Sequence, residues 1–337
     1  MSVLVTGGAG YIGSHAAIAL HDSGRRVVLL DDLSNASAAA VDAVRVLTSS
    51  DIPFVEGDAA DVGLVDDAMG RFGVDEVVHF AASKSVAESV NEPLAYFRNN
   101  LGSLLGVLAA MEARGIKRLV FSSSCTVYGE PEVVPVTEAS PVAAVNPYGV
   151  TKLQGEQLLD VIASAGGLDV MLLRYFNPIG AHLTGSIGED PTGTPTNLVP
   201  LLMEVAVGRR DRLQVFGGDY DTPDGSAVRD YLHVVDLAEA HVAALEALAS
   251  RPGATAVNLG TGRGYSVLEV IGMAEEVMGR SIAYEIVGRR PGDAERIWAD
   301  PSFASEVLGW TAQRGLREMI QDHWRWCEAH PMGFETV

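Results

Sequence analysis

The sequence feature that most restricts the fold is a glycine-rich run between a short apolar segment and a helical pattern. Residues 2–6 read as a strand, and the run Gly7-Gly8-Ala9-Gly10-Tyr11-Ile12-Gly13 follows it directly. Apolar residues then recur at helical spacing as far as residue 20. Glycines at this place let the backbone approach a pyrophosphate, while the N-terminus of the next helix offers N–H donors. We therefore predict a phosphate-binding loop, and a plain glycine turn is the alternative.

An acidic residue after the next predicted strand indicates which cofactor this loop would hold. The strand covers residues 26–30 and is followed by Asp31, 18 residues past Gly13. A carboxylate at this place suits an adenosine ribose with free hydroxyls and repels a 2′-phosphate. The sequence therefore favours NAD over NADP.

Strand and helix patterns continue to alternate through the first half of the chain. Further strands are predicted at residues 53–55, 76–80, 118–122 and 170–173, with helices at 36–48, 62–71, 93–113 and from 147 onward. Six such units joined by short connections predict an α/β fold with a parallel, doubly wound (Rossmann) sheet.

In the second half of the chain the regular alternation of strands and helices ends. A long connection is predicted at residues 178–195, and shorter elements follow it. These elements are helices at 198–207, 235–248 and 267–278, strands at 213–216, 256–259 and 282–286, and two helices within 301–329. The helix at 235–248 and the strand at 256–259 indicate a return to the main sheet. We predict an NAD-binding domain at residues 1–175 plus about 231–262, and a smaller, discontinuous substrate domain at about 176–230 plus 263–337.

A tyrosine and a lysine one helical turn apart are the candidates for the chemistry. Asn146 and Pro147 are typical of a helix start, which places Tyr148 and Lys152 on the same face. A phenol loses its proton near pH ~10, so its use as a base near neutrality requires roughly 4 kcal/mol of stabilisation of the anion. One ammonium at about 4 Å and an effective dielectric of about 20 supplies that amount. The alternative is an ordinary half-buried tyrosine beside a solvated lysine.

In doubly wound sheets, ligands bind at the carboxyl ends of the strands. The residues that follow the predicted strands are Asp58, Ala81-Ala82-Ser83-Lys84, Ser122-Ser123-Ser124 and Tyr175-Phe176-Asn177. We expect these segments to outline one crevice.

The formal net charge of −20 argues against nucleic acid or an anionic membrane as a partner. An anionic ligand would need local cations, and Arg229 and Arg290 offer planar forks for phosphate oxygens, although both could instead form surface salt bridges. Asp293 could accept hydrogen bonds from ribose hydroxyls or pair with Arg290 or Arg296. Two cysteines are too few for a disulfide framework and no cluster suggests a metal. We expect no leader and no membrane-spanning run. We expect a cytoplasmic protein.

The motifs together resemble those of a known superfamily. The glycine run, Ser122-Ser123-Ser124, Asn146-Pro147-Tyr148-Gly149 with Lys152, Arg229-Asp230-Tyr231, and Arg290 with Asp293 occur in the order found in extended short-chain dehydrogenases/reductases. Within that superfamily the chain resembles the UDP-glucose 4-epimerase (UDP-galactose 4-epimerase) family over nearly its whole length. The resemblance implies tightly held NAD that is not consumed.

The resemblance also implies roles for individual residues. Ser124, Tyr148 and Lys152 would be catalytic. The implied cofactor-binding residues are Gly7, Gly10, Tyr11, Ile12, Gly13, Asp31, Asn35, Asp58, Ala59, Phe80, Ala81, Ala82, Lys84, Asn99, Ser122, Tyr148, Lys152 and Phe176. The implied substrate-binding residues are Lys84, Ser124, Tyr148, Asn177, Asn197, Leu198, Gln214, Phe216, Arg229, Arg290, Asp293 and Ile297.

The expected reaction is epimerisation at C4 of a UDP-hexose through a transient 4-keto sugar, with Tyr148 as base, Lys152 lowering its pKa and Ser124 as relay. One alternative is another NAD-dependent sugar-nucleotide enzyme, either a UDP-N-acetylglucosamine 4-epimerase or a 4,6-dehydratase. Related dehydratases carry Asp-Glu directly after the active-site hydroxyl residue, whereas Cys125 and Thr126 stand here. A regulatory module that binds NAD without catalysis is disfavoured because the serine, tyrosine and lysine are all present.

Two further expectations come from the resemblance. Ile297 stands where a small residue goes with acceptance of N-acetylhexosamines and a bulky aromatic with their exclusion, so weak N-acetyl activity is expected. The family is commonly homodimeric through the helices expected at residues 93–113 and 147–165. Their apolar residues allow such a bundle, although packing on the sheet would explain the same residues: Leu101, Leu104, Leu105, Leu108, Leu158, Leu159 and Ile162.

Overall fold

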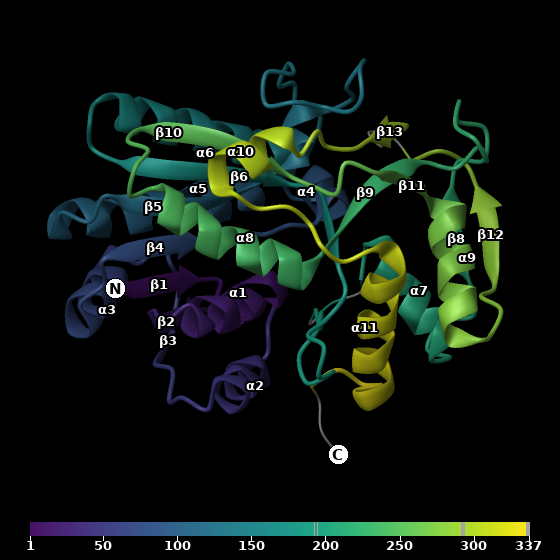
Figure 1. The fold of residues 1–337 in the computed structure, drawn as a ribbon, viewed down its shortest axis with the longest axis horizontal. Coiled ribbons are helices and arrows are strands. Elements are labelled where there is room, and N and C mark those ends of the chain that lie inside the picture. The colour runs from purple at the N-terminus through teal and green to yellow at the C-terminus, as the bar shows by residue number, and fades with distance from the viewer. Residues whose placement is uncertain (192, 194, 291–293, 335–337) are drawn as a thin grey trace.

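A computed structural model describes residues 1–191, 193, 195–290 and 294–334. Its main element is a seven-stranded sheet of order β10-β6-β5-β4-β1-β2-β3, in which every pair of neighbours is parallel (Figure 1). The strands of this sheet are β1 (Ser2–Thr6), β2 (Arg26–Asp31), β3 (Phe54–Glu56), β4 (Glu76–His79), β5 (Arg118–Ser124), β6 (Asp169–Tyr175) and β10 (Ala254–Leu259). The predicted parallel α/β sheet and its late seventh strand are confirmed.

Helices cover both faces of this sheet, as a doubly wound fold requires. The helices that belong to this part are α1 (Tyr11–Asp22), α2 (Ala38–Thr48), α3 (Val62–Phe72), α4 (Val86–Asn91), α5 (Pro93–Arg114), α6 (Pro147–Ser164), α8 (Val234–Ala247) and α10 (Ser302–Leu308). Alternate strand residues point to opposite faces. Val3 and Val5 therefore join a core with α1, α2, α8 and α10, whereas Leu4 joins a core with α3, α5 and α6.

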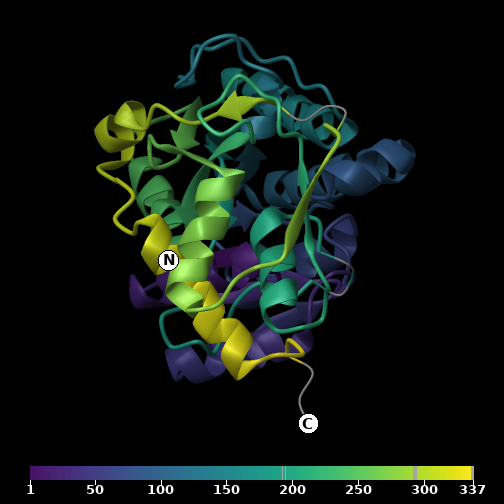
Figure 2. The same ribbon diagram turned by 90° about the vertical axis from the view of Figure 1, so that its right-hand side faces the viewer.

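A smaller group of elements lies beside the sheet and faces the viewer in Figure 2. It contains α7 (Leu198–Ala206), α9 (Val267–Met278) and α11 (Leu316–Ala329), which share a third core. A small sheet joins β7 (Asn177–Ile179), β9 (Val228–His233), β11 (Gly264–Ser266) and β13 (Arg296–Ile297). A separate pair consists of β8 (Leu213–Phe216) and β12 (Tyr284–Val287). The domain boundaries given above stay a prediction.

Several short elements differ from the expectations. Helix α4, the 3₁₀ turn η1 (Cys125–Tyr128) and the strands β7, β9, β11 and β13 were not predicted, and β7 begins the stretch expected to be an irregular connection. The predicted strand at 282–286 is shifted to Tyr284–Val287. These strands are two to six residues long and pair only with one another, so they lack the apolar runs that mark the strands of the main sheet.

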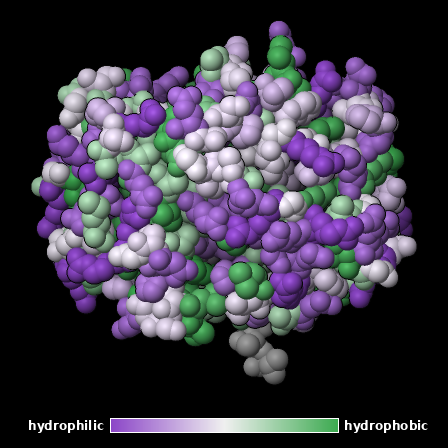
Figure 3. All heavy atoms as spheres, in the orientation of Figure 1, coloured by the Kyte–Doolittle hydropathy of each residue, from purple (hydrophilic) through white to green (hydrophobic). Residues whose placement is uncertain are grey.

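Polar and charged side chains are interspersed with small apolar areas over the face shown in Figure 3. Among the described residues, no helix is both long enough and apolar enough to span a bilayer.

Helix α5 passes so close to the loop after β3 that glycine is required at the contact. A Cβ atom on Gly106 would lie 2.4 Å from the carbonyl oxygen of Ala59 and 2.8 Å from Cα of Ala60. Because both contacts are to backbone, a larger residue has to displace the loop that carries Asp58, one of the residues expected to contact the cofactor.

We predict that Gly106→Ala lowers the free energy of unfolding by roughly 1–3 kcal/mol, because the added methyl overpacks this contact. The matched control is Gly272→Ala in α9, where a Cβ meets nothing within 4 Å. That change should stabilise by roughly 0.5–1 kcal/mol, since alanine is the better helix former. Denaturant unfolding of the two variants checks the prediction, and equal shifts in the two would contradict it.

Candidate functional site

The glycine loop between β1 and α1 packs so closely against other backbone that side chains would not fit at two of its positions. Gly7 has φ of 68°, and a Cβ atom there would lie 2.8 Å from the amide nitrogen of Ala81. A Cβ on Gly13 would lie 2.1 Å from the carbonyl oxygen of Gly7. No side chain caps α1 at Gly10, so the helix presents its backbone donors to this loop. The geometry fits the predicted pyrophosphate site.

Asp31, the last residue of β2, faces the same loop. Its Oδ2 accepts a hydrogen bond from Ala9 N at 3.0 Å and its Oδ1 accepts from Leu33 N at 2.9 Å. Burial raises the pKa of Asp31, and these backbone hydrogen bonds oppose that effect. A carboxylate has about four lone-pair sites, so the two oxygens can still accept from ribose hydroxyls.

The neighbouring strand ends bring further predicted cofactor residues to this edge of the sheet. Exposed Asp58 follows β3, and its Oδ1 accepts from Ala60 N at 2.8 Å, while Asn35 is exposed on the turn after β2. After β4, the side chain of Asn99 on α5 donates to Ser83 Oγ at 3.1 Å. The carboxyl ends of β1, β2, β3 and β4 therefore contribute to one edge, as predicted.

Helix α6 sets the position of Tyr148 and Lys152. Asn146 Oδ1 accepts from Gly149 N at 2.9 Å, which caps the helix, and Pro147 is its first residue. Both predicted start signals are confirmed. Lys152 Nζ lies 5.9 Å from the centroid of the Tyr148 ring and donates to the carbonyl oxygen of Ser122 at 2.7 Å. Tyr148 and Lys152 are both buried.

Burial decides the protonation of this pair. It raises the pKa of Tyr148 to about 12, although a hydrogen bond with Ser124 acts in the opposite direction. It lowers the pKa of Lys152 to about 7, against the attraction of Glu156. A nearby ammonium favours the phenolate, so Lys152 would oppose the effect of burial on Tyr148. That Lys152 lowers the pKa of Tyr148 stays a prediction.

The serine run at the end of β5 lies against α6. Ser124 is buried, and its Oγ accepts from Thr126 N at 3.2 Å and from Thr126 Oγ1 at 3.0 Å. Ser122 Oγ forms a short hydrogen bond with the hydroxyl of Tyr175 on β6. The hydroxyl of Ser124 is thus held beside Tyr148, where a relay would be needed.

Lys84 has a partner that sequence reasoning missed. Its Nζ donates to Oε1 of Glu189 at 2.8 Å and lies 6.0 Å from the centroid of the Tyr11 ring. The Glu189 side chain is only 4% exposed, although it comes from the connection expected to be irregular. No sequence pattern pointed to it, because a lone glutamate in a loop normally reads as solvated. A ligand anion at Lys84 would compete with this carboxylate.

In the smaller group of elements, the small sheet gathers three predicted substrate residues. Asn177 on β7 is paired with Tyr231, and Ile297 on β13 is paired with Arg229, both partners being on β9. Ile297 is buried and shares a core with Cys125, Tyr128 and Phe176.

The remaining predicted substrate residues lie at β8 and α7. Arg290 lies over the Phe216 ring at 5.1 Å, and Gln214 is exposed on the same strand. Asn197 and Leu198 stand at the N-terminus of α7. Asp293 lies outside the described residues.

No role was predicted for Asp230 of the Arg229-Asp230-Tyr231 motif. In the structure its side chain joins the small sheet to the turn after β10. It accepts hydrogen bonds from Thr261 N, Gly262 N and Ala299 N at 2.9–3.2 Å. Burial raises its pKa to about 6. The motif therefore marks a junction between segments.

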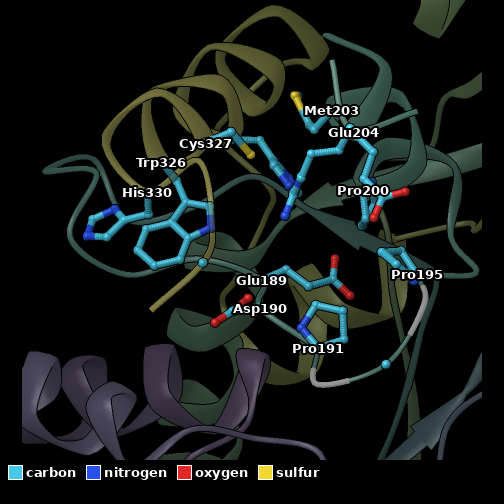
Figure 4. Close-up of a pocket in the computed structure, with 14 residues that line it drawn as sticks. Glu189, Asp190, Pro191, Pro195, Pro200, Met203, Glu204, Trp326, Cys327 and His330 are labelled. Atoms are coloured by element: carbon cyan, nitrogen blue, oxygen red, sulfur yellow. The ribbon is translucent and has the colours of Figure 1, made fainter. Parts of the chain in front are cut away.

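A cavity of about 100 Å³ lies between α7, α11 and the segment that carries Glu189 (Figure 4). Glu189, Met203, Trp326 and Cys327 are among its lining residues, and it contains none of the predicted cofactor or substrate residues. Across the described ranges, no group of three or more His, Cys, Asp or Glu side chains could hold a metal ion.

Known proteins resemble the whole chain. A family model described as the NAD dependent epimerase/dehydratase family matches residues 3–260. A UDP-glucose 4-epimerase from Bacillus subtilis (strain 168) is 51% identical over 338 residues, covering 100% of both chains. A UDP-glucose 4-epimerase from Homo sapiens is 47% identical, covering 99% of this chain and 98% of that protein.

Solved structures of UDP-glucose 4-epimerases have a similar fold over nearly the whole chain. A UDP-glucose-4-epimerase from Stenotrophomonas maltophila, with bound NAD and formylated UDP-arabinopyranose, has a TM-score of 0.96 at 47% identity, covering 98% of this chain and 99% of that one. A UDP-glucose 4-epimerase from Bifidobacterium longum, in complex with NAD+ and UDP, has a TM-score of 0.96 at 45% identity, covering 99% and 100%.

We predict that stability rises with pH between about 7, the folded pKa of Lys152, and the ordinary lysine value of about 10.4. In that interval the unfolded chain binds a proton that the folded chain does not, so raising the pH favours folding by roughly 4–5 kcal/mol in total. Lys152→Met should remove this rise, whereas Lys117→Met, at an exposed lysine, should retain it. Denaturant unfolding across the interval measures both slopes, and identical slopes would contradict the prediction.

Proposed function

The chain belongs to the NAD dependent epimerase/dehydratase family, and from that premise we propose that it interconverts UDP-glucose and UDP-galactose by epimerisation at C4. The observation that carries the proposal is the arrangement of Ser124, Tyr148 and Lys152 on adjoining elements at the carboxyl edge of the sheet. The names of its relatives and structural neighbours support the same substrate.

The residues of the crevice fit NAD as the cofactor. The glycine loop with the N-terminus of α1 would hold the pyrophosphate, Asp31 the adenosine ribose and the loop at Asp58 and Ala59 the adenine. Tyr148 and Lys152 would face the nicotinamide ribose, with Phe176 nearby. When bound, the nicotinamide supplies a hydride acceptor that takes two electrons from the sugar C4 and returns them. We propose that residues 1–175 plus about 231–262 form the part that binds it.

Tyr148 would act as the base on the sugar 4-hydroxyl. Its pKa of about 12 has to fall, and the ammonium of Lys152 together with the positive charge of the oxidised cofactor would stabilise the phenolate. Ser124 would pass the proton between the hydroxyl and the phenolate. As C4 becomes a ketone, Tyr148 holds the proton, and it returns that proton to O4 after the ketone has presented its other face.

The substrate nucleotide would be held on the far side of the crevice. The guanidinium groups of Arg229 and Arg290 would bind diphosphate oxygens, which a protein with a net charge of −20 can attract only locally. Asn177 and Ile297 would lie beside the sugar, because β7 and β13 flank β9. Weak activity on N-acetylhexosamines, expected from Ile297, stays a prediction that a comparison of UDP-galactose with UDP-N-acetylgalactosamine tests.

The dehydratase alternative receives no support from the residue after Ser124. Cys125 stands there in place of the acidic pair of related dehydratases, and burial raises the pKa of its thiol to about 12. Both cysteines are free and buried, which agrees with the proposed cytoplasmic location.

We predict that Tyr148→Phe lowers kcat for UDP-galactose by roughly 10²–10⁴-fold, because the proton acceptor is lost. The matched control is Tyr284→Phe on exposed β12, which should retain activity. Sugar-nucleotide products are separated and quantified at equal NAD content. Full activity in Tyr148→Phe would disprove the catalytic assignment, and a 4-keto-6-deoxy product from the unaltered protein would disprove the reaction.

We also propose a homodimer formed through α5 and α6. Leu104 and Leu159 are fully buried against the sheet, but Leu105 is 52% exposed and Val161 is 68% exposed on neighbouring helices. Packing on the sheet therefore explains why Leu104 and Leu159 are apolar. The exposed Leu105 and Val161 are left to contact a second copy of the chain.

We predict that Leu105→Glu with Val161→Glu makes the protein monomeric, since buried charges would oppose association. Val46→Glu on α2, where the valine is 75% exposed, should leave the dimer intact. Sedimentation analysis distinguishes the two results. Unaltered protein that sediments as a monomer would rule the dimer out.

A further inference from the structure

A buried ion pair lies behind the Tyr148–Lys152 pair, and none of the roles described above uses it. Glu156 is on α6 one turn after Lys152, and Arg174 is on β6. Arg174 Nε lies 2.9 Å from Oε1 of Glu156, and its Nη2 lies 2.6 Å from Oε2. The side chains are 9% and 5% exposed, so both charges are almost fully desolvated.

This pair is joined to the serine run on β5. Ser123 Oγ donates to Glu156 Oε1 in a short hydrogen bond. The carbonyl oxygen of Ser122 accepts a hydrogen bond from Lys152 Nζ at 2.7 Å. Two consecutive residues of β5 are thus bound to two side chains one turn apart on α6. Ser124 comes next on the strand, so its place beside Tyr148 depends on these two contacts.

The guanidinium of Arg174 is itself fixed from the other side. Its Nη1 donates to the hydroxyl of Tyr128 at 3.0 Å, and that hydroxyl donates to Asn258 Oδ1 on β10 at 2.7 Å. Asn258 Nδ2 in turn donates to the carbonyl oxygen of Val136, whose own amide donates to Trp298 O at 2.9 Å. Trp298 directly follows β13, so the contacts run from α6 to the strand that carries Ile297, a predicted substrate residue.

The charge of Glu156 also affects the protonation of Lys152. A buried ion pair contributes little net stability, because desolvation of both ions offsets their attraction. A buried ammonium tends to lose its proton, and Glu156 opposes that tendency at Lys152. Arg174 meanwhile holds the carboxylate in place through hydrogen bonds from Nε and Nη2.

We propose that Glu156, fixed by Arg174, is a positioning residue for the Tyr148–Lys152 pair: its carboxylate binds the serine run to α6 and keeps Lys152 charged. This inference rests on the proposed function, because a charged Lys152 is needed there to stabilise the phenolate. Glu156 itself touches neither substrate nor cofactor in that scheme.

The test compares Glu156→Gln with the double variant Glu156→Gln/Arg174→Gln. The single change leaves an unpaired buried guanidinium, so it can lower stability for reasons unrelated to catalysis. The double change removes both charges and should fold even where the single variant does not. The matched control is Asp236→Asn/Arg314→Gln, which removes another ion pair with a fully buried carboxylate between α8 and the segment before α11.

The first readout does not depend on activity. The chain has only three lysines, Lys84, Lys117 and Lys152, so lysine labelled with ¹³C at Cε gives three signals that Lys→Arg variants at 84 and 117 assign. In the double variant Lys152 should titrate at lower pH than in the unaltered protein, by about one pH unit. The control should titrate as the unaltered protein does.

The second readout is the pH profile of epimerisation. Above the Lys152 titration, kcat of the double variant should fall by roughly tenfold, with KM changed by less than about twofold, since the ammonium fraction falls tenfold per pH unit. The control should keep the profile of the unaltered protein. An unchanged Lys152 titration, or a shifted titration with unchanged kcat, overturns the inference. An unaltered protein without epimerase activity defeats the proposed function instead, while the titration still reports whether Glu156 acts on Lys152.

Discussion

The burial of an ammonium beside a phenol is the constraint on which the rest of the site depends. In a dry environment both groups favour their neutral forms, so Lys152 tends to lose its proton and Tyr148 tends to keep its own. A base made from this pair needs negative charge near the lysine and positive charge near the tyrosine. The chain contributes Glu156 for the first, and a bound oxidised nicotinamide would contribute the second.

The fold meets this need by bringing strand ends together. Parallel strands that run in one direction place their carboxyl ends on a single edge, and the chain puts glycines on the first, an acid on the second and hydroxyls on the fifth. Helix α6 then lies against that edge with Tyr148, Lys152 and Glu156 on one face. The substrate-facing strands come from segments far along the chain, and Asp230 holds them to the turn after β10.

Much of this could be predicted because the signals are local. The bounds of β8 and α9 agree with the predicted residues, and in the structure Ser266 caps α9 by accepting from Glu269 N. The short strands β7, β9 and β13 were missed because pairing with distant segments, and not their own composition, makes them strands. Glu156 and Glu189 were missed for a related reason: a glutamate reads as solvated until its buried partner, Arg174 or Lys84, is known. The catalytic roles of individual residues stay predictions.

The late seventh strand has a consequence for how the protein forms during synthesis. Strand β10 pairs with β6 only after some eighty intervening residues have been made, and α8, which packs against α1, also belongs to that late segment. Until then a nascent chain exposes the edge of β6 and one side of its first helix. Open strand edges invite pairing with other chains, and contacts of such long range form slowly. While the residues between β6 and β10 are being made, the sheet therefore has an uncovered edge at β6 that the complete protein covers with β10.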